Sequence, residues 1–374
     1  MTEVARHWSA CYQPRMNASF RHAVIVLALA LSAACGSSSS SSSAAPPGSG
    51  DGGVPDGGGD AGGPSAAACT ATPQKLYATS NGLLSMAADA ANLYVAERSS
   101  TGDTIWRIPK SGAAPVALAA DIAKKDESQV QAIAVDGGFV YWVAVSTGAE
   151  LTGSIGRVPT TGGAATTLVA NRPVNFYGNI LVAADNVYWT EASTTAPVTG
   201  NVARMASAGG AVSTIATGPD SRVPEQLAAG DGFVFFTLAG DDNNVSSAGK
   251  KLMRAPLGGG AAEEVAATMG LDDALATNAT SILYESGDKV AVLPLGGGPP
   301  SALLDFVGPT AIVADDKSAY AIDGSSVVKR AALDASSPPT ELSDHADALL
   351  RSIAVDDKCV YWTNLNEGLF MREK

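Results

Sequence analysis

A short sequence pattern recurs along most of this chain and constrains its fold more than any other feature. It joins an apolar stretch, a turn of Asp, Gly or Asn and an aromatic pair, as in IAVDGGFVYWVAV from Ile133 and IAVDDKCVYWTNL from Ile353. The aromatic position, or Leu in one copy, falls at Tyr94, Tyr141, Tyr188, Phe235, Leu283, Tyr320 and Tyr361. The spacings are 47, 47, 47, 48, 37 and 41 residues. Periods of about 40–50 residues built from short strands indicate the blades of a β-propeller.

Each copy of the repeat predicts four antiparallel strands, which we name a to d. Strand a precedes the Asp/Gly/Asn turn, and strand b carries the aromatic pair. Strand c has the form I-x-R-x-P, as in IWRIP from Ile105 and IGRVP from Ile155, and a Gly-rich turn leads to a short apolar strand d. The 40 glycines and the low content of charged residues, 16%, suit an all-β chain with many tight turns.

The seventh copy lacks a strand d after its strand c. It contains strand a (352–355), strand b (359–363) and strand c (369–372). Residues 74–79, QKLYAT, match the d strands in pattern and lie just before the first strand a. An open ring would leave two unpaired strand edges. We therefore predict an all-β, seven-bladed β-propeller of four-stranded antiparallel blades, in which the N-terminal strand pairs within the last blade.

The strand b motifs resemble a known repeat. Tyr188-Trp189-Thr190 and Tyr361-Trp362-Thr363 resemble the YWTD repeat of receptor propellers, although Glu191 and Asn364 stand where that repeat has Asp. The receptor family usually has six blades. Residues 74–374 are also similar to uncharacterised propeller lipoproteins of soil bacteria. The resemblance implies the fold and no particular ligand.

The N-terminal region predicts export and lipidation. Arg21 and His22 precede an apolar run, and small residues lead to Cys35, which resembles the acylated Cys of a bacterial lipoprotein signal. Ser32 stands where the lipobox prefers Leu, so simple cleavage near Ala34 is the alternative. We therefore expect residues 1–34 to be a leader with a signal peptide, 35–68 to be the lipidated Cys and a disordered Ser/Gly/Pro tether, and 69–374 to be the propeller.

The charge of the chain argues against nucleic acid as a partner. The formal net charge is −13, and an acidic surface repels phosphate backbones. Acidity favours solubility, and it is also compatible with binding of cations.

Two columns of polar residues recur in the repeat. Strand c carries an arginine in six copies, and an Asp or Asn ends strand a in five. The residues are Arg107, Arg157, Arg204, Arg254, Arg330 and Arg372, and Asp89, Asp136, Asn278, Asp315 and Asp356. Both columns fall on one face of the ring, so we expect structural Arg–Asp hydrogen bonds within or between blades.

Cys69 and Cys359 are the cysteines left for the folded domain. Cys359 begins strand b of the seventh blade and Cys69 precedes strand d of the same blade, so a disulfide would secure the closure. The alternative is two unpaired thiols.

Groups for catalysis are sparse in this sequence. His345 is the one histidine after the leader, no G-x-S-x-G nucleophile elbow occurs, and we assign no catalytic or cofactor-binding residue. Carboxylates do gather in the loops between strand d and the next strand a, where they could bind Ca²⁺ as in lactonase-type propellers. These weak metal candidates are Asp126, Glu127, Asp272, Asp273, Asp344 and Asp347.

These features favour a binding role over catalysis. We expect a monomeric lipoprotein, anchored in the membrane through Cys35 and located in the cell envelope, at the outer membrane of a Gram-negative bacterium. Its propeller face would act as an interaction scaffold for a protein or carbohydrate ligand. The alternatives are a Ca²⁺-dependent hydrolase or lyase on the channel face, and a structural component of the envelope.

Overall fold

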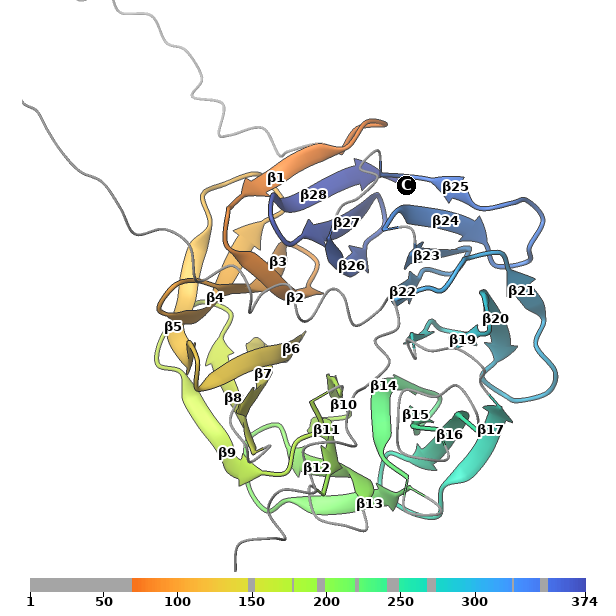
Figure 1. The fold of residues 1–374 in the computed structure, drawn as a ribbon, viewed down its shortest axis with the longest axis horizontal. Helices are drawn as coiled ribbons and strands as arrows, with labels where there is room; N and C mark the ends of the chain where they lie inside the picture. Colours follow the sequence, from red (N-terminus) through yellow and green to blue (C-terminus); the bar gives the residue numbers. More distant parts are fainter. Residues whose placement is uncertain are drawn as a thin grey trace, which may run out of the picture. The chain divides into compact units, whose positions relative to one another are not determined.

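The computed structural model describes residues 69–374, apart from residues 147–151, 177, 194–198, 219–221, 241–248, 268–273, 325 and 344–348. These residues belong to the second of two compact units, Ala61–Lys374, and the first unit, Met1–Asp60, lies outside the described residues. The described part contains 28 strands and no helix. They form seven four-stranded antiparallel sheets. The predicted seven-bladed β-propeller is confirmed (Figure 1).

The first four blades follow the chain directly, each from an inner strand to an outer one. Blade 1 is β2 (Gly82–Ala88), β3 (Asn92–Arg98), β4 (Gly102–Pro109) and β5 (Val116–Lys124). Blade 2 is β6 (Ser128–Asp136), β7 (Phe139–Ser146), β8 (Gly153–Pro159) and β9 (Thr166–Arg172). Blade 3 is β10 (Ile180–Ala183), β11 (Asn186–Ala192), β12 (Gly200–Ala206) and β13 (Ser213–Thr217). Blade 4 is β14 (Pro224–Gly230), β15 (Phe233–Leu238), β16 (Lys251–Pro256) and β17 (Glu263–Ala267).

The remaining blades include the closure. Blade 5 is β18 (Leu275–Thr277), β19 (Ser281–Ser286), β20 (Lys289–Pro294) and β21 (Ala302–Leu304). Blade 6 is β22 (Ala311–Ala314), β23 (Ser318–Ile322), β24 (Val328–Ala332) and β25 (Thr340–Glu341). Blade 7 is β26 (Leu350–Val355), β27 (Cys359–Asn364), β28 (Gly368–Glu373) and, on its outer edge, β1 (Gln74–Ala78).

The N-terminal strand closes the ring as predicted. β1 pairs antiparallel with β28, with Gln74 opposite Met371 and Ala78 opposite Gly368. Gly368 has φ +120°, and a Cβ added there would lie 2.0 Å from the Tyr77 carbonyl oxygen. The residue at this corner must therefore be glycine for β1 to approach so closely.

The hydrophobic core is divided among the contacts between blades. The described residues form seven buried clusters, and each joins two neighbouring blades. The aromatic pairs of strand b supply the largest members, and Trp189 and Trp362 are fully buried. These aromatic residues therefore hold adjacent blades together, as their recurrence in the repeat suggested.

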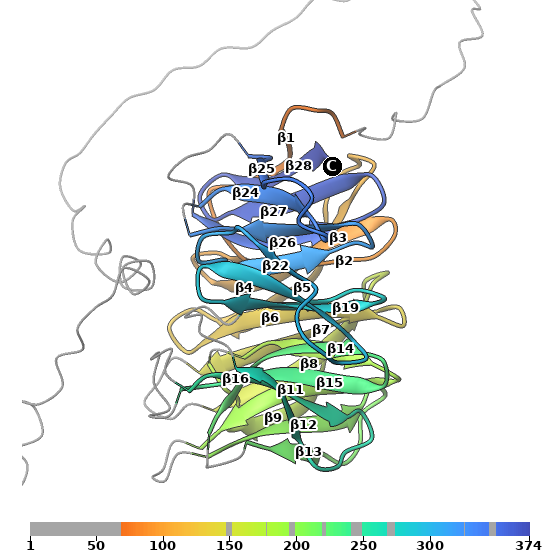
Figure 2. The same cartoon turned by 90° about the vertical axis from the view of Figure 1, so that its right-hand side faces the viewer.

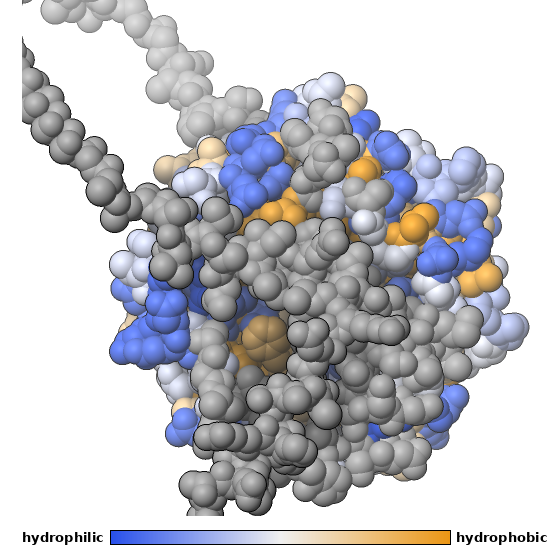
Figure 3. Space-filling model, viewed as in Figure 1, coloured by the Kyte–Doolittle hydropathy of each residue, from blue (hydrophilic) through white to orange (hydrophobic). Residues whose placement is uncertain are grey.

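The turns gather on two opposite faces of the propeller unit, because the strands run across the ring's thickness (Figure 2). The a–b and c–d turns share one face, which we call the turn face. The b–c and d–a loops share the other, which we call the loop face. On the rim in Figure 3 the described atoms are mainly hydrophilic, and Val116, Leu303 and Val307 are the exposed large hydrophobic side chains among the described residues.

Candidate functional site

The strand c arginines connect each blade to the next across the turn face. Arg107 donates from Nη1 to the carbonyl oxygen of Thr160 at 2.8 Å, and Arg204 donates to that of Leu257 at 2.8 Å. Arg157 likewise donates to the Ser207 carbonyl at 2.6 Å. Each acceptor is the first residue after strand c in the following blade. The expected Arg–Asp hydrogen bonds are therefore wrong for these arginines, because a c–d turn of the neighbouring blade, and not an a–b turn, lies opposite strand c.

The aspartates of the a–b turns have other partners. Asp356 Oδ1 accepts hydrogen bonds from the backbone N–H groups of Lys358 and Cys359, and its Oδ2 accepts from the Tyr361 hydroxyl at 2.8 Å. The ammonium of Lys110 in blade 1 also binds this Oδ2 at 2.7 Å. Burial alone raises the pKa of the Asp356 carboxyl, but these hydrogen bonds outweigh it and lower the pKa to about 2.

Asp315 repeats this arrangement between blades 6 and 7. Its Oδ2 accepts from the Tyr320 hydroxyl at 3.0 Å and from the Lys374 ammonium at 2.6 Å. Burial again raises the pKa of the carboxyl, and the hydrogen bonds from Lys374, the turn backbone and Tyr320 outweigh it, so the pKa falls to about 2. Lys374 thus joins the two blades in the way that Lys110 joins blades 7 and 1.

The arginines at the boundary between blades 6 and 7 depart from this pattern. The Nε of Arg330 donates to the buried hydroxyl of Ser318 at 3.0 Å, and among the described residues no carbonyl of a c–d turn binds the guanidinium. Arg372 lies opposite Val360, whereas in blade 6 Arg330 lies opposite Tyr320. This one-residue offset turns Arg372 back toward blade 6, where its Nη1 donates to the Leu342 carbonyl. The two guanidinium groups therefore enter the same inter-blade gap from opposite sides.

A pocket of about 320 Å³ opens in this gap. Blade 6 contributes β23, β24 and the segment around β25, and blade 7 contributes the end of β28 and the residues just before β1. The lining residues are Ala71, Ser318, Arg330, Ala332, Ser337, Thr340, Leu342, Arg372, Glu373 and Lys374. We call this site the blade 6–7 pocket.

The blade 6–7 pocket is rich in cationic donors. Lys374 is neutralised by Asp315, whereas Arg330 and Arg372 form no ion pair with a carboxylate in the described part of the chain. The terminal nitrogens of Arg330 and the Nε and Nη2 of Arg372 also make no hydrogen bond there. Guanidinium N–H groups without a protein acceptor at a pocket are available to an anionic ligand.

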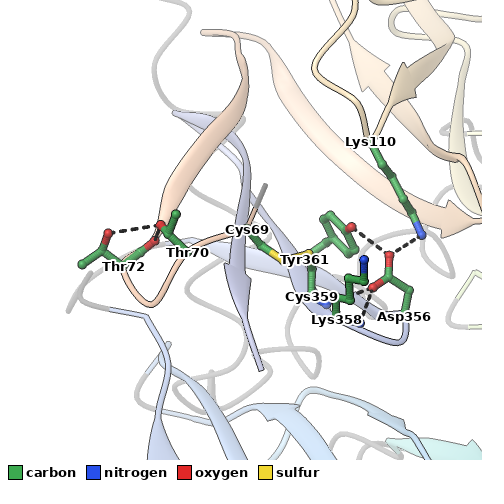
Figure 4. Close-up of a disulfide and its surroundings, with 8 residues drawn as sticks. All are labelled: Cys69, Thr70, Thr72, Lys110, Asp356, Lys358, Cys359 and Tyr361. Atoms are coloured by element: carbon green, nitrogen blue, oxygen red, sulfur yellow. Dashed lines mark hydrogen bonds and ion pairs between the residues drawn. A yellow bond between two sulfur atoms is a disulfide. The ribbon is translucent and has the colours of Figure 1, made fainter. Parts of the chain in front are cut away.

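A disulfide fixes one wall of the pocket. Cys69 and Cys359 are bonded to each other, with their Cα atoms 6.0 Å apart (Figure 4). Next to this bond, the Glu373 N–H donates to the Thr70 carbonyl at 2.9 Å. The segment that carries Ala71 is therefore held to blade 7 by the disulfide and the Thr70 bond on one side and by the pairing of β1 with β28 on the other.

The loop face contains buried ion pairs of a structural kind. The Arg98 guanidinium binds both oxygens of the fully buried Asp103, which also accepts from the Val130 backbone N–H. Arg172 binds both oxygens of Glu191 in the same bidentate way. Burial raises the pKa of Asp103, although its hydrogen bonds to Arg98 and Val130 oppose this. These pairs tie strand ends together, and Glu191 does so from the position where the YWTD repeat has Asp.

Of the carboxylates predicted as weak metal candidates, the structure describes Asp126 and Glu127. Asp126 and Glu127 lie in the loop between β5 and β6, and the exposed Glu127 pairs with Lys124 at 3.8 Å. The other four candidates, Asp272, Asp273, Asp344 and Asp347, lie outside the described residues, as does His345. Among the described residues no group of three or more His, Cys, Asp or Glu side chains has the geometry to hold a metal ion.

The predicted leader, Cys35 and the tether also lie outside the described residues. A search of the described residues for a membrane-spanning helix finds none.

Comparison with known proteins identifies the fold. No protein-family model matches the chain, and no curated protein matches its sequence. A catalytically inactive virginiamycin B lyase from Staphylococcus aureus, crystallised with quinupristin, has a TM-score of 0.60 at 13% identity and covers 80% of this chain and 98% of its own. The computationally designed Ika8 protein has a TM-score of 0.53 at 11% identity, with the same coverage. A puromycin-hydrolyzing peptidase of Mycobacterium tuberculosis has a TM-score of 0.52 at 14% identity, covering 74% of this chain and 48% of its own. What they share with this chain is the β-propeller fold. At these identities the likeness extends no further.

Sequence reasoning did not find the blade 6–7 pocket. It assigned all six arginines of strand c to one structural role. One signal distinguishes Arg372. In blade 1 the arginine lies opposite the repeat tyrosine, Tyr94, whereas in blade 7 Met371 lies opposite Tyr361 and Arg372 follows one residue later.

Proposed function

We propose that this protein is a lipid-anchored, extracytoplasmic binding scaffold that engages its ligand on the turn face. The observation that carries this proposal is the blade 6–7 pocket, where two arginines reach into a cavity without carboxylate partners in the described part. Elsewhere on this face the corresponding arginines are occupied, Arg107, Arg157 and Arg204 by backbone carbonyls and Arg254 by Glu263. The pocket is thus a break in a structural pattern, and such a break is a reasonable place for a binding site.

The proposed anchor is supported by the sequence. The apolar run before Cys35 and the Ser/Gly/Pro-rich segment after it suit a lipoprotein that holds its domain away from a membrane surface. Metabolic labelling with an alkyne analogue of palmitate should mark the wild-type protein and leave Cys35→Ala unmarked. Labelling that persists in Cys35→Ala would contradict the anchor.

The scaffold role predicts that capture of an envelope component depends on the pocket. The purified protein is cross-linked to an envelope extract, and the captured material is quantified for the wild type and for the Arg330→Glu/Arg372→Glu variant. We expect the variant to lose most of the capture, because two charges are reversed at the site. Arg254→Glu is the matched control, since Arg254 occupies the same strand c position in blade 4. Equal capture by all three proteins would exclude the turn-face pocket as the binding site.

A further inference from the structure

We infer that the blade 6–7 pocket is a site for the phosphate group of a small ligand. The inference rests on the proposed function, because it names the ligand chemistry of that binding face. Arg330 on β24, Arg372 on β28 and Lys374 beyond β28 approach the cavity from two blades. Phosphate is the group that such a set of donors matches best, for reasons of geometry, charge and size.

The geometry favours an anion whose oxygens point in several directions. Arg330 reaches the cavity from blade 6 and Arg372 from blade 7, while Ser318, Ser337 and Thr340 add hydroxyl donors along its wall. A carboxylate presents two oxygens in one plane and is satisfied by one guanidinium fork. A phosphate presents oxygens in a tetrahedron, so it can accept from both guanidinium groups and a hydroxyl at once.

The charge in the cavity also suits a phosphate. Asp315 offsets the charge of Lys374, with 2.6 Å between the carboxylate and the ammonium, and Glu373 is an exposed residue of the lining. Arg330 and Arg372 retain their charges without carboxylate partners among the described residues. A phosphate carries between one and two negative charges near pH 7 and would balance these two cations.

The size limits the rest of the ligand. A cavity of about 320 Å³ lies near the lower end of the range for small-molecule sites, about 300–1,000 Å³. It accommodates a phosphate together with a small organic group. It does not accommodate a large ligand entirely within its walls.

The closure of the ring explains why this site occurs between blades 6 and 7. In blades 2, 3 and 4 the c–d turn supplies the carbonyl that binds the arginine of the preceding blade. In blade 7 the place of strand d is taken by β1, which comes from the other end of the propeller sequence. No c–d turn therefore joins β28 to its outer neighbour. Arg330 therefore lacks the carbonyl acceptor that Arg107, Arg157 and Arg204 have, and the gap is left open for a ligand.

The test is isothermal titration calorimetry at low ionic strength. The purified full-length protein is titrated with inorganic phosphate and, separately, with glycerol 1-phosphate. We expect binding in at least one titration. Arg330→Gln and Arg372→Gln should each weaken that binding about tenfold or more, as is typical when a charge-assisted hydrogen bond is lost. Arg254→Gln should bind like the wild type, because Arg254 has the same repeat position and pairs with Glu263 away from the pocket. Binding of inorganic phosphate alone would identify the free anion as the ligand, and binding of glycerol 1-phosphate would identify a phosphate monoester.

Misfolding is separated from loss of the site by a second variant and by the melting temperature. Arg330→Lys keeps the charge and removes the fork, so it should bind between the wild type and Arg330→Gln, with an unchanged melting temperature in the absence of phosphate. Binding of neither probe to the wild type, or equal binding by all the variants, would overturn the inference. A separate outcome contradicts the scaffold proposal alone: phosphate binds, but the Arg330→Glu/Arg372→Glu variant captures as much envelope material as the wild type.

Discussion

The arginine of strand c shows how one residue type takes two roles at one repeat position. Arg157 stacks on the Phe139 ring at 4.2 Å and donates to the Ser207 carbonyl of the next blade. Arg330 has the same place in its strand, yet it lines the blade 6–7 pocket, and its terminal nitrogens make no hydrogen bond in the described part of the chain. The two roles differ because blade 3 offers Arg157 a carbonyl from its c–d turn, whereas blade 7 offers Arg330 no such turn.

The structural role can be measured at Arg157. Arg157→Leu should lower the free energy of unfolding by about 1–2 kcal/mol, because the Ser207 carbonyl loses a charge-assisted donor. Urea unfolding provides the measurement. Arg254→Leu is the control, because Arg254 also stacks on an aromatic ring but pairs with the exposed Glu263, so the loss should be below about 0.5 kcal/mol. Equal losses in the two variants would contradict an inter-blade role for Arg157.

The turn aspartates should make stability depend on acidity. The pKa of Asp356 is about 2 in the folded protein and 3.8 in its unperturbed state. Because the folded pKa is the lower one, the stabilisation is complete above about pH 5 and is lost as the pH falls from about 4 to 2.

Asp356→Asn tests this dependence. The variant should be less stable than the wild type near pH 7, by about 1–2 kcal/mol, and the difference should shrink toward pH 2. Urea unfolding at a series of pH values gives both curves. Parallel curves down to pH 2 would show that the contacts with Lys110 and Tyr361 do not lower the pKa of the Asp356 carboxyl.

At the scale of elements, strand pattern and turn residues were sufficient to predict the blades. An aromatic residue at the repeat position identified strand b in blades 1–4, 6 and 7, and even in blade 5, where Leu283 replaces it, the strand forms. The spare strand 74–79 was predicted to close blade 7, and β1 does so over Gln74–Ala78. Alternation along a strand tells which face of a sheet a side chain occupies, and the closure followed from the missing strand d of the seventh copy.

The contacts between blades could not be predicted in the same way. Arg107 and Asp89 were placed correctly on one face, but their partners depend on the angle and distance between neighbouring sheets, which no local pattern records. The pocket was missed for the same reason. It arises where Arg372 is offset by one residue and where β1 replaces a connected strand d.

The disulfide makes a prediction about the closing elements. Cys69 and Cys359 are 290 residues apart, and in the chain-entropy model a bond across such a loop stabilises the fold by on the order of 5 kcal/mol. A reductant should therefore lower the melting temperature of the wild type. It should not affect Cys69→Ser/Cys359→Ser, whose melting temperature should already be low. Two free thiols in the unreduced native protein, detected by mass spectrometry, would contradict the bond.

At the scale of the whole propeller unit, stability comes from a closed series of blade contacts. Each buried cluster joins two blades, and the cluster between blades 7 and 1 includes Leu76 and Tyr77 of β1 at its edge. Because β1 precedes blade 1 in the chain and completes blade 7, losing this strand weakens the contact that joins the first and last blades.

Removal of residues 69–78 is the corresponding experiment. The truncated protein should melt at a lower temperature and form concentration-dependent oligomers, because the edge of β28 becomes available for pairing with other chains. Light scattering after size-exclusion chromatography gives the molar mass. The control is Thr70→Ala/Thr72→Ala, which alters the same segment and leaves β1 intact. A truncated protein that remains monomeric with an unchanged melting temperature would show that β1 is dispensable.

The order of synthesis gives the closing strand a particular place in time. β1 emerges among the first strands of the propeller, whereas its partner β28 is made after all the other blades. Until then the N-terminal segment has no sheet to join and Cys69 has no native partner. Pairing across such a separation is a late and slow event in folding. We therefore expect folding intermediates in which most blades have formed while β1 and its thiol remain accessible to chaperones and to enzymes of disulfide exchange.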